Sequence, residues 1–213
     1  MWRIVVLMGM ALLGACSQTA KAPAKPAGSD QETEQQWIDD KMRDARAGHV
    51  DPDFVSLLSG QTQRKLLAGD FQGALITAEP LAQVTEIVNG PNSPKTASAL
   101  EMLADLYCNL DRCAESIALL ERAGAIYQQQ GQPGRVPYVR TLNSIGASWN
   151  LLGQPARAEP VLKQSLALSQ QYFGTDSREV GVVYWLLMSS YSAQGRNTDA
   201  DAAKAKAQKL LRR

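Results

Sequence analysis

The stretch from Leu142 to Ser165 reads LNSIGASWNLLGQPARAEPVLKQS, and it decides the fold. In and just beyond this stretch, apolar residues recur at helical spacing on both sides of a glycine: Leu142, Ile145, Trp149 and Leu152 before it, and Ala158, Leu162, Leu166 and Leu168 after it. Gly153 suits a tight turn because glycine reaches positive φ without steric penalty, and Pro155 suits the first turn of a helix. The stretch therefore predicts two helices joined by a short turn.

The same pattern recurs along the chain with a fixed period. Tyr107, Trp149 and Tyr191 stand 42 residues apart, and Lys65 takes the same place one period earlier. Three further positions keep this register: Gly69, Asp111, Gly153 and Gly195 four residues on; Ala74, Ser116, Ala158 and Ala200 nine on; Leu81, Ala123, Ser165 and Ala207 sixteen on. The small residues would let paired helices approach closely. A period of this length predicts an all-α solenoid of about four helix-turn-helix units, in residues 52–213.

These residues resemble tetratricopeptide (TPR) repeats. The run Ala104 to Tyr107, with Asp111 and Ala123 after it, and the run Gly146 to Trp149, with Gly153, Ala158 and Ser165 after it, carry the resemblance. The ordinary TPR unit has 34 residues, so the 42-residue period resembles the longer kinesin-light-chain type. We place the extra residues between units, in 89–94 and 173–177, and the units at about 54–95, 96–137, 138–179 and 180–213. The resemblance implies binding of a protein or peptide.

The N-terminus resembles a bacterial lipoprotein precursor. Arg3 precedes an apolar run, Ile4 to Leu13, that is too short to span a bilayer, and Leu13-Gly14-Ala15-Cys16 resembles a lipobox. The resemblance implies that residues 1–15 are a signal peptide, that Cys16 carries lipid, and that Ser17 favours the periplasmic face of the outer membrane. An ordinary signal peptide with a chance cysteine is the alternative.

Residues 16–28 and 29–48 differ in composition. The first segment is rich in Ala, Lys, Pro and Ser and lacks large apolar residues, so we expect a flexible tether. The second begins with Ser29 and Glu32 spaced as a capping box, and Trp37, Ile38, Met42 and Ala45 form one apolar stripe. It predicts a cap helix over the first unit, with disorder as the alternative.

The sequence offers little for catalysis. His49 is the single histidine, and there is no CxxC pair, so we expect neither a metal site nor a cofactor and no enzyme activity. The 21 acidic residues match the basic ones once Arg3 is removed with the signal peptide, and no basic stripe suggests nucleic acid. Glu101 and Asp105 lie one helical turn apart, a spacing typical of a solvated or groove-facing acidic patch. The surface is therefore expected to work by binding.

Cys108 and Cys113 flank Asp111 on the two helices of the second unit. An oxidising periplasm would permit a disulfide between them. Free cysteines are also common as small buried apolar residues, so a bridge and a pair of buried thiols both remain open. A catalytic redox pair is a third reading.

The TPR resemblance also implies which residues line the inner surface. They lie two, six and nine residues before Tyr107, Trp149 and Tyr191, and one after, and include Glu101, Asp105, Arg140, Asn143, Asn150, Val182, Trp185 and Ser189. Asn143 matches a groove asparagine of the kinesin-light-chain type, and an asparagine offers both a donor and an acceptor. Trp185 is either an aromatic anchor for a partner or a residue that packs on the cap helix.

The combined hypothesis is an outer-membrane lipoprotein that acts as a TPR adaptor or assembly scaffold in the cell envelope, for example for envelope enzymes, secretion or pilus components. The alternative is a periplasmic disulfide-exchange module that uses Cys108 and Cys113.

Overall fold

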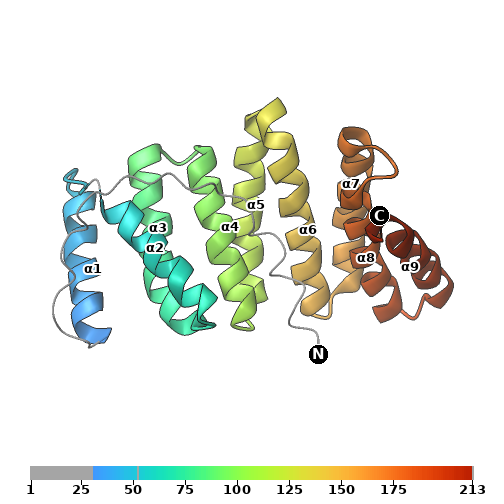
Figure 1. Ribbon diagram of the computed structural model, residues 1–213, viewed down its shortest axis with the longest axis horizontal. Coiled ribbons are helices and arrows are strands. Elements are labelled where there is room, and N and C mark those ends of the chain that lie inside the picture. Colours follow the sequence, from blue (N-terminus) through green and yellow to red (C-terminus); the bar gives the residue numbers. More distant parts are fainter. Residues whose placement is uncertain (1–30, 52, 213) are drawn as a thin grey trace.

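The computed structural model describes residues 31–51 and 53–212, and these form a row of antiparallel helices (Figure 1). Within this part of the chain the α-helices are α1 Gln31–Arg46, α2 Phe54–Leu67, α3 Phe71–Asn89, α4 Pro94–Asn109, α5 Cys113–Gln129, α6 Arg135–Leu151, α7 Pro155–Phe173, α8 Arg178–Ala193 and α9 Asn197–Leu211. A short 3₁₀ helix, η2, covers Gln132–Gly134. Helices α2 to α9 pair consecutively into four hairpins, which confirms the predicted all-α solenoid. The predicted signal peptide, tether, Cys16 and Ser29 lie outside the described residues.

We call the first helix of each hairpin its A helix and the second its B helix. Each A helix ends in the same way. The residue four after the register position is left-handed, with φ of 73° at Gly69, 61° at Asp111, 68° at Gly153 and 72° at Gly195. The next residue then donates its N–H to the carbonyl of the register residue, for example Arg112 to Tyr107 at 2.9 Å and Gln154 to Trp149 at 2.9 Å. This is a Schellman motif, and it explains why glycine fits this place in three of four units.

The connections between units are short. Gly90 and Gly174 end α3 and α7 with positive φ, and Ser93 and Ser177 then cap α4 and α8 by accepting hydrogen bonds from the N–H groups of Thr96 and Val180. The connectors predicted to hold the extra residues are thus compact turns. Much of the 42-residue period lies in long B helices, since α3 and α7 have 19 residues each.

Small residues lie where the helices of a hairpin cross. Ala74, Ser116 and Ala158 are at most 1% exposed, and Ala200 is also buried. Gly146 on α6 shows how close the approach is, because a Cβ there would overlap Cγ and Cδ2 of Leu162 on α7. The small residues of the repeat are therefore buried, as the steric role inferred from the sequence requires.

Helix α1 packs over the first unit. Its residues Ile38, Met42 and Ala45 are buried in one cluster with Phe54 and Leu58 of α2 and Leu81 and Val84 of α3, and Trp37 lies edge-on to Phe54. Lys65, which stands at the aromatic register position of the first unit, places its Nζ 3.3 Å from Glu34 of α1. The exception in the aromatic series thus contacts the cap helix. Among the described helices, none is both long and apolar enough to cross a membrane.

Candidate binding face

The A helices α4, α6 and α8 lie side by side and are joined by polar side chains. Thr141 of α6 donates to Oε1 of Glu101 on α4 at 2.6 Å, and Ser190 of α8 donates to Oδ1 of Asn150 on α6 at 2.7 Å. On each A helix one stripe stays at least partly exposed while the opposite side packs on B helices. We call these stripes on α2, α4, α6 and α8 the A-helix face. We include in it the eight predicted binding residues, each of which is at least partly exposed.

Glu101 is held firmly in place. Besides Thr141, its carboxylate accepts a hydrogen bond from the Tyr127 hydroxyl at 2.9 Å, and the guanidinium of Arg140 lies 3.7 Å away. The Glu101 side chain is 16% exposed, whereas that of Arg140 is 59% exposed. Burial raises the pKa of Glu101, although the two hydroxyls and Arg140 act in the opposite direction. Glu101 therefore joins three helices and has little bonding capacity left for a ligand.

Asp105 lies one turn further along α4 and is bonded quite differently. Its side chain is mostly buried, yet among the described residues no group donates a hydrogen bond to its carboxylate. Burial and the nearby Glu101 carboxylate raise its pKa to about 7, and Arg140 opposes this shift. At the same register, α2, α6 and α8 carry the uncharged residues Gln63, Ala147 and Ser189. Asp105 is thus a carboxylate without a bonded counter-charge.

The two predicted asparagines hold helices together. Asn143 accepts a hydrogen bond from Ser165 of α7 at 2.6 Å. Asn150 accepts from Ser190 and donates to the carbonyl of Leu186 at 3.2 Å, so both ends of its amide are used between α6 and α8. Asn143 keeps its amide NH₂ group without a partner in the described part of the chain. Of the two asparagines, Asn143 is therefore the one whose amide N–H groups can still donate a hydrogen bond to a ligand.

The residues of α8 form the apolar end of the face. Val182 is 39% exposed, and Trp185 and Ser189 are half-buried. Tyr184, Leu187 and Tyr191 pack instead with Ala158 and Leu162, and Trp185 belongs to none of the buried clusters. Helix α1 lies at the other end of the row (Figure 1), so the alternative that Trp185 packs on the cap helix is wrong.

Sequence reasoning missed further apolar residues on this face. Leu67, Val136 and Leu151 are 81%, 49% and 60% exposed. Each falls on the exposed stripe of its helix, since Leu67 follows Gln63 by four residues, Leu151 follows Ala147 by four, and Val136 precedes Arg140 by four. The helical spacing of four from a predicted position was the signal that could have found them.

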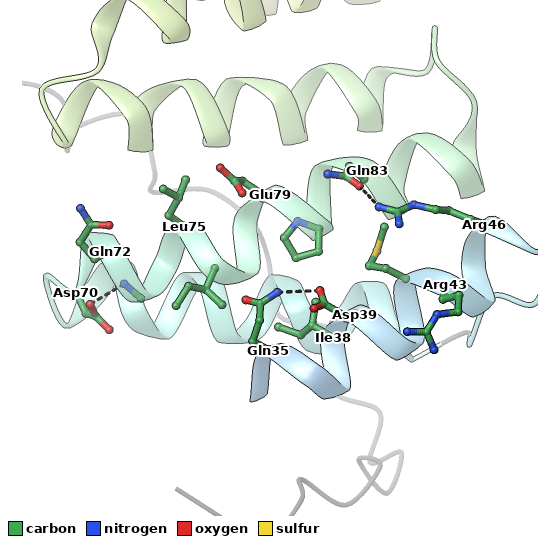
Figure 2. Close-up of a pocket in the computed structure, with 14 residues that line it drawn as sticks. Gln35, Ile38, Asp39, Arg43, Arg46, Asp70, Gln72, Leu75, Glu79 and Gln83 are labelled. Atoms are coloured by element: carbon green, nitrogen blue, oxygen red, sulfur yellow. Dashed lines mark hydrogen bonds between the residues drawn. The ribbon is translucent and has the colours of Figure 1, made fainter. Parts of the chain in front are cut away.

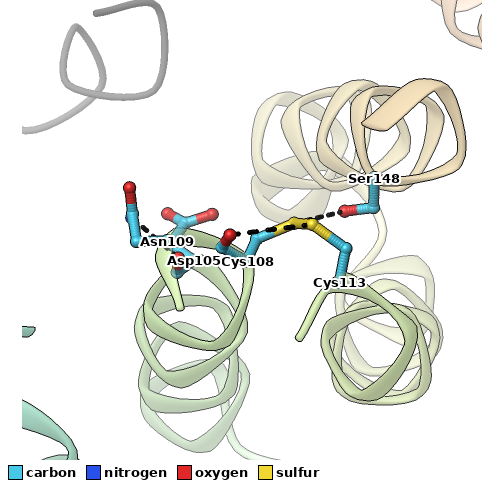
Figure 3. The surroundings of a disulfide bond; sticks show 5 residues. All are labelled: Asp105, Cys108, Asn109, Cys113 and Ser148. Atoms are coloured by element: carbon cyan, nitrogen blue, oxygen red, sulfur yellow. Dashed lines mark hydrogen bonds between the residues drawn. A yellow bond between two sulfur atoms is a disulfide. The ribbon is translucent and has the colours of Figure 1, made fainter. Parts of the chain in front are cut away.

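The two cysteines form a disulfide in the structure (Figure 3). It joins the end of α4 to the start of α5 across the left-handed Asp111. Cys113 is 4% exposed, and Cys108 is half-buried with its sulfur 3.5 Å from Ser148 Oγ. The sequence left open a bridge or a pair of buried thiols, and the structure has the bridge. Cys108 lies one helical turn from Asp105.

A separate depression of about 670 Å³ lies between α1 and α3 (Figure 2). Its rim is polar, with a hydrogen bond from Arg46 to Gln83 and another from Gln35 to Asp39. Ile38, Met42 and Leu75 contribute its apolar part. The sequence did not predict this depression, and it contains no residue of the A-helix face.

No group of histidine, cysteine and acidic residues in the described ranges could hold a metal ion. His49 is exposed in the loop after α1.

Comparisons with known proteins agree with this geometry. Residues 96–133 and 139–179 match the family model described as tetratricopeptide repeat. No curated protein matches the chain. Among solved structures, the nearly identical TPR-like repeats of a Podosopora anserina kinesin light chain share 16% identity with a TM-score of 0.63, covering 84% of this chain and 93% of that one. A point variant of the same repeats gives a TM-score of 0.64 at the same identity and coverage.

BtubC (BKLC) from P. vanneervenii, at 17% identity, gives a TM-score of 0.53 and covers 84% of this chain and 90% of that one. TPR arrays are interaction modules, which gives this array a role in binding other proteins. Two units, residues 96–133 and 139–179, are therefore tetratricopeptide repeats by the family model, and most of the row has the fold of the TPR-like repeats of a kinesin light chain.

Proposed function

We propose that this protein is an outer-membrane lipoprotein whose TPR array acts as an adaptor in the cell envelope and binds a protein partner on the A-helix face. The observation that carries the proposal is the composition of that face. It combines an unbonded carboxylate at Asp105 with exposed apolar side chains at Val136, Leu151 and Val182. These apolar residues all lie on the exposed stripes of neighbouring A helices, and large exposed apolar surfaces mark interaction sites.

The membrane part of the proposal rests on the sequence Leu13-Gly14-Ala15-Cys16. A lipid-modified Cys16 with two or more acyl chains would give stable anchoring, because each buried CH₂ contributes about 0.8 kcal/mol. The following residues, 17–28, would span roughly 35 to 40 Å if extended, which is enough to hold the array clear of the headgroups.

The anchor is tested by fractionation and palmitate labelling of the wild type and Cys16→Ser. We expect the wild type in the outer membrane with label, and the variant unlabelled and released or unprocessed. A variant that still carries label and stays in the outer membrane would remove the anchor from the proposal.

The binding face is tested by affinity purification of the acylated protein from membranes, followed by mass spectrometry. Val182→Asp should lose the partner. Val88→Asp is the matched control, since Val88 is 49% exposed on α3 and lies outside the A-helix face. Retention of the same partner by both variants would place the binding site elsewhere.

The disulfide-exchange alternative is not supported by a specific observation. An exchanging cysteine needs an accessible thiolate in an electropositive setting. Cys113 is almost fully buried, and Cys108 lies one helical turn from Asp105. The bridge therefore fits a structural role in the α4–α5 hairpin.

A further inference from the structure

We infer that the A-helix face binds an extended segment of its partner that carries a lysine or arginine side chain for Asp105 and an apolar side chain for α8, about five or six residues apart. This inference rests on the proposed adaptor function and specifies the kind of segment that is bound. It is argued from the distribution of charge, the exposed apolar side chains and the spacing of the A helices.

The charge on the face is unbalanced at α4. Two carboxylates, Glu101 and Asp105, share one nearby cation, Arg140. Arg140 lies on the Glu101 side, 3.7 Å from Oε2 of Glu101, and Glu101 also has two hydroxyl donors. Asp105 has no donor among the described residues. A cationic side chain from outside would supply the missing partner, and hydrogen bonds between ionised groups are the strong ones.

The environment of Asp105 favours a positively charged ligand over other polar ligands. Its raised pKa of about 7 reflects burial and the Glu101 charge, so the ionised form lacks compensation in the free protein. An acidic segment would add a third negative charge beside these two carboxylates. A basic residue would instead form the charged pair that α4 lacks.

The other end of the segment is set by α8. Val182 is 39% exposed, and Trp185 is half-buried one turn further on without joining a buried cluster. Between the two ends, α6 offers Ala147 and the exposed Leu151, which present no charge. A segment that runs from Asp105 across α6 to Trp185, one turn nearer the start of α8 than Ser189, would therefore meet an apolar surface after its basic residue.

The spacing follows from helix packing. Helices in contact have axes about 8 to 10 Å apart, so α4 and α8, with α6 between them, are roughly 16 to 20 Å apart. An extended chain advances about 3.3 Å per residue. Five or six residues therefore separate the basic and the apolar side chain.

The experiment selects random twelve-residue peptides displayed on phage against the full chain, purified in detergent. We expect the selected peptides to share a lysine or arginine and a large apolar residue five or six positions away, in either order. Synthetic copies should bind Asp105→Asn at least about tenfold more weakly than the wild type, since an ionic partner of a mostly buried charge is lost. Asp201→Asn, an exposed acid on α9, makes the same chemical change off the face and should leave the affinity unchanged.

Two other outcomes are separable. If the selected peptides lose binding to Val182→Asp but lack a basic residue, or bind Asp105→Asn as well as the wild type, the inference is overturned and the adaptor function stands. If no selected peptide is sensitive to Val182→Asp or to Leu151→Asp, both the inference and the proposed binding face are overturned. Circular dichroism melts of every variant exclude unfolding as the cause, and Asn replaces Asp105 without a change in shape.

Discussion

The guanidinium of Arg157 lies over the ring of Trp149, with its carbon 3.5 Å from the ring centroid. The same relationship recurs in the neighbouring units, where Arg112 lies 4.3 Å from the Tyr107 ring and Arg196 lies 4.4 Å from the Tyr191 ring. Each arginine comes from the turn or the start of the B helix that follows the aromatic residue. The aromatic residues of the repeat therefore have one face covered by a cation from their own hairpin.

The close crossing of α6 and α7 predicts that Gly146→Ala destabilises the array. The new Cβ would overlap the fully buried Leu162, so one of the helices or the leucine must shift, at a cost of about 1 to 3 kcal/mol. Gly60→Ala on α2 is the control, because nothing lies within 4 Å of its Cβ position. It should raise the free energy of unfolding by about 0.4 to 1 kcal/mol. Urea unfolding of both variants checks this, and equal effects would contradict the crossing.

The left-handed turns predict that Asp111→Gly and Gly153→Asp differ in their effect on stability. Asp111 has φ of 61° where the other units have glycine, so Asp111→Gly should be neutral or stabilising by up to about 1 kcal/mol. Gly153→Asp puts the same side chain into the same conformation and should cost about 1 kcal/mol. Nothing lies within 4 Å of a Cβ at Gly153, so backbone conformation alone is tested. Thermal melts that moved in the same direction would argue against this account.

Much of the fold was accessible from the sequence because it depends on local rules. Gly69, Gly153 and Gly195 mark Schellman turns, and Ala74 and Ala158 mark crossings, and both signals repeat at a fixed period. The hydrogen bonds that individual residues of the A-helix face make could not be predicted from the sequence. The sequence put Asn150 and Asp105 in one class, yet Asn150 is saturated by α8 and Asp105 is unbonded, because this depends on side chains 36 to 40 residues away. The depression beside α1 was missed since α1 does not follow the repeat.

Asp105 predicts a loss of stability with rising pH. Its pKa is raised from 3.8 to about 7 in the folded chain, so between these values the folded protein binds a proton that the unfolded chain has released. The contribution of the Asp105 proton to the free energy of unfolding is therefore fully present below about pH 4. It is lost as the pH rises through 7. Asp105→Asn should be more stable than the wild type at pH 8, by on the order of 1 to 3 kcal/mol, and closer to it at pH 5. Urea unfolding at the two pH values measures the difference.

The matched control for this pH effect is again Asp201→Asn. A second check is direct titration of the Asp105 carboxyl by NMR. Glu101→Gln should lower the pKa of Asp105 by removing a like charge, and Arg140→Ala should raise it by removing an opposite one. Shifts of the reverse sign would show that these neighbours do not control Asp105.

The position of Trp185 predicts that its removal weakens peptide binding without a matching loss of stability. It is half-buried and belongs to no buried cluster, so Trp185→Ala should change the melting temperature little and weaken binding of the selected peptides by about 2 kcal/mol. Tyr184→Ala is the neighbouring control, because Tyr184 packs with Ala158 and Leu162. It should reduce stability more than peptide affinity. A large loss of stability with unchanged affinity in Trp185→Ala would assign the tryptophan to the core.

The regular spacing of the A helices also fixes the spacing of the side chains that a bound segment would need. Each unit adds one helix to the face, and one interhelical step of about 8 to 10 Å corresponds to about three residues of an extended chain. In the proposed binding mode, the distance between the basic and the apolar side chain of the bound segment is therefore a whole number of interhelical steps. Inserting one further copy of residues 138–179 between α4 and α8 would lengthen the recognised spacing by about three residues, without altering either end.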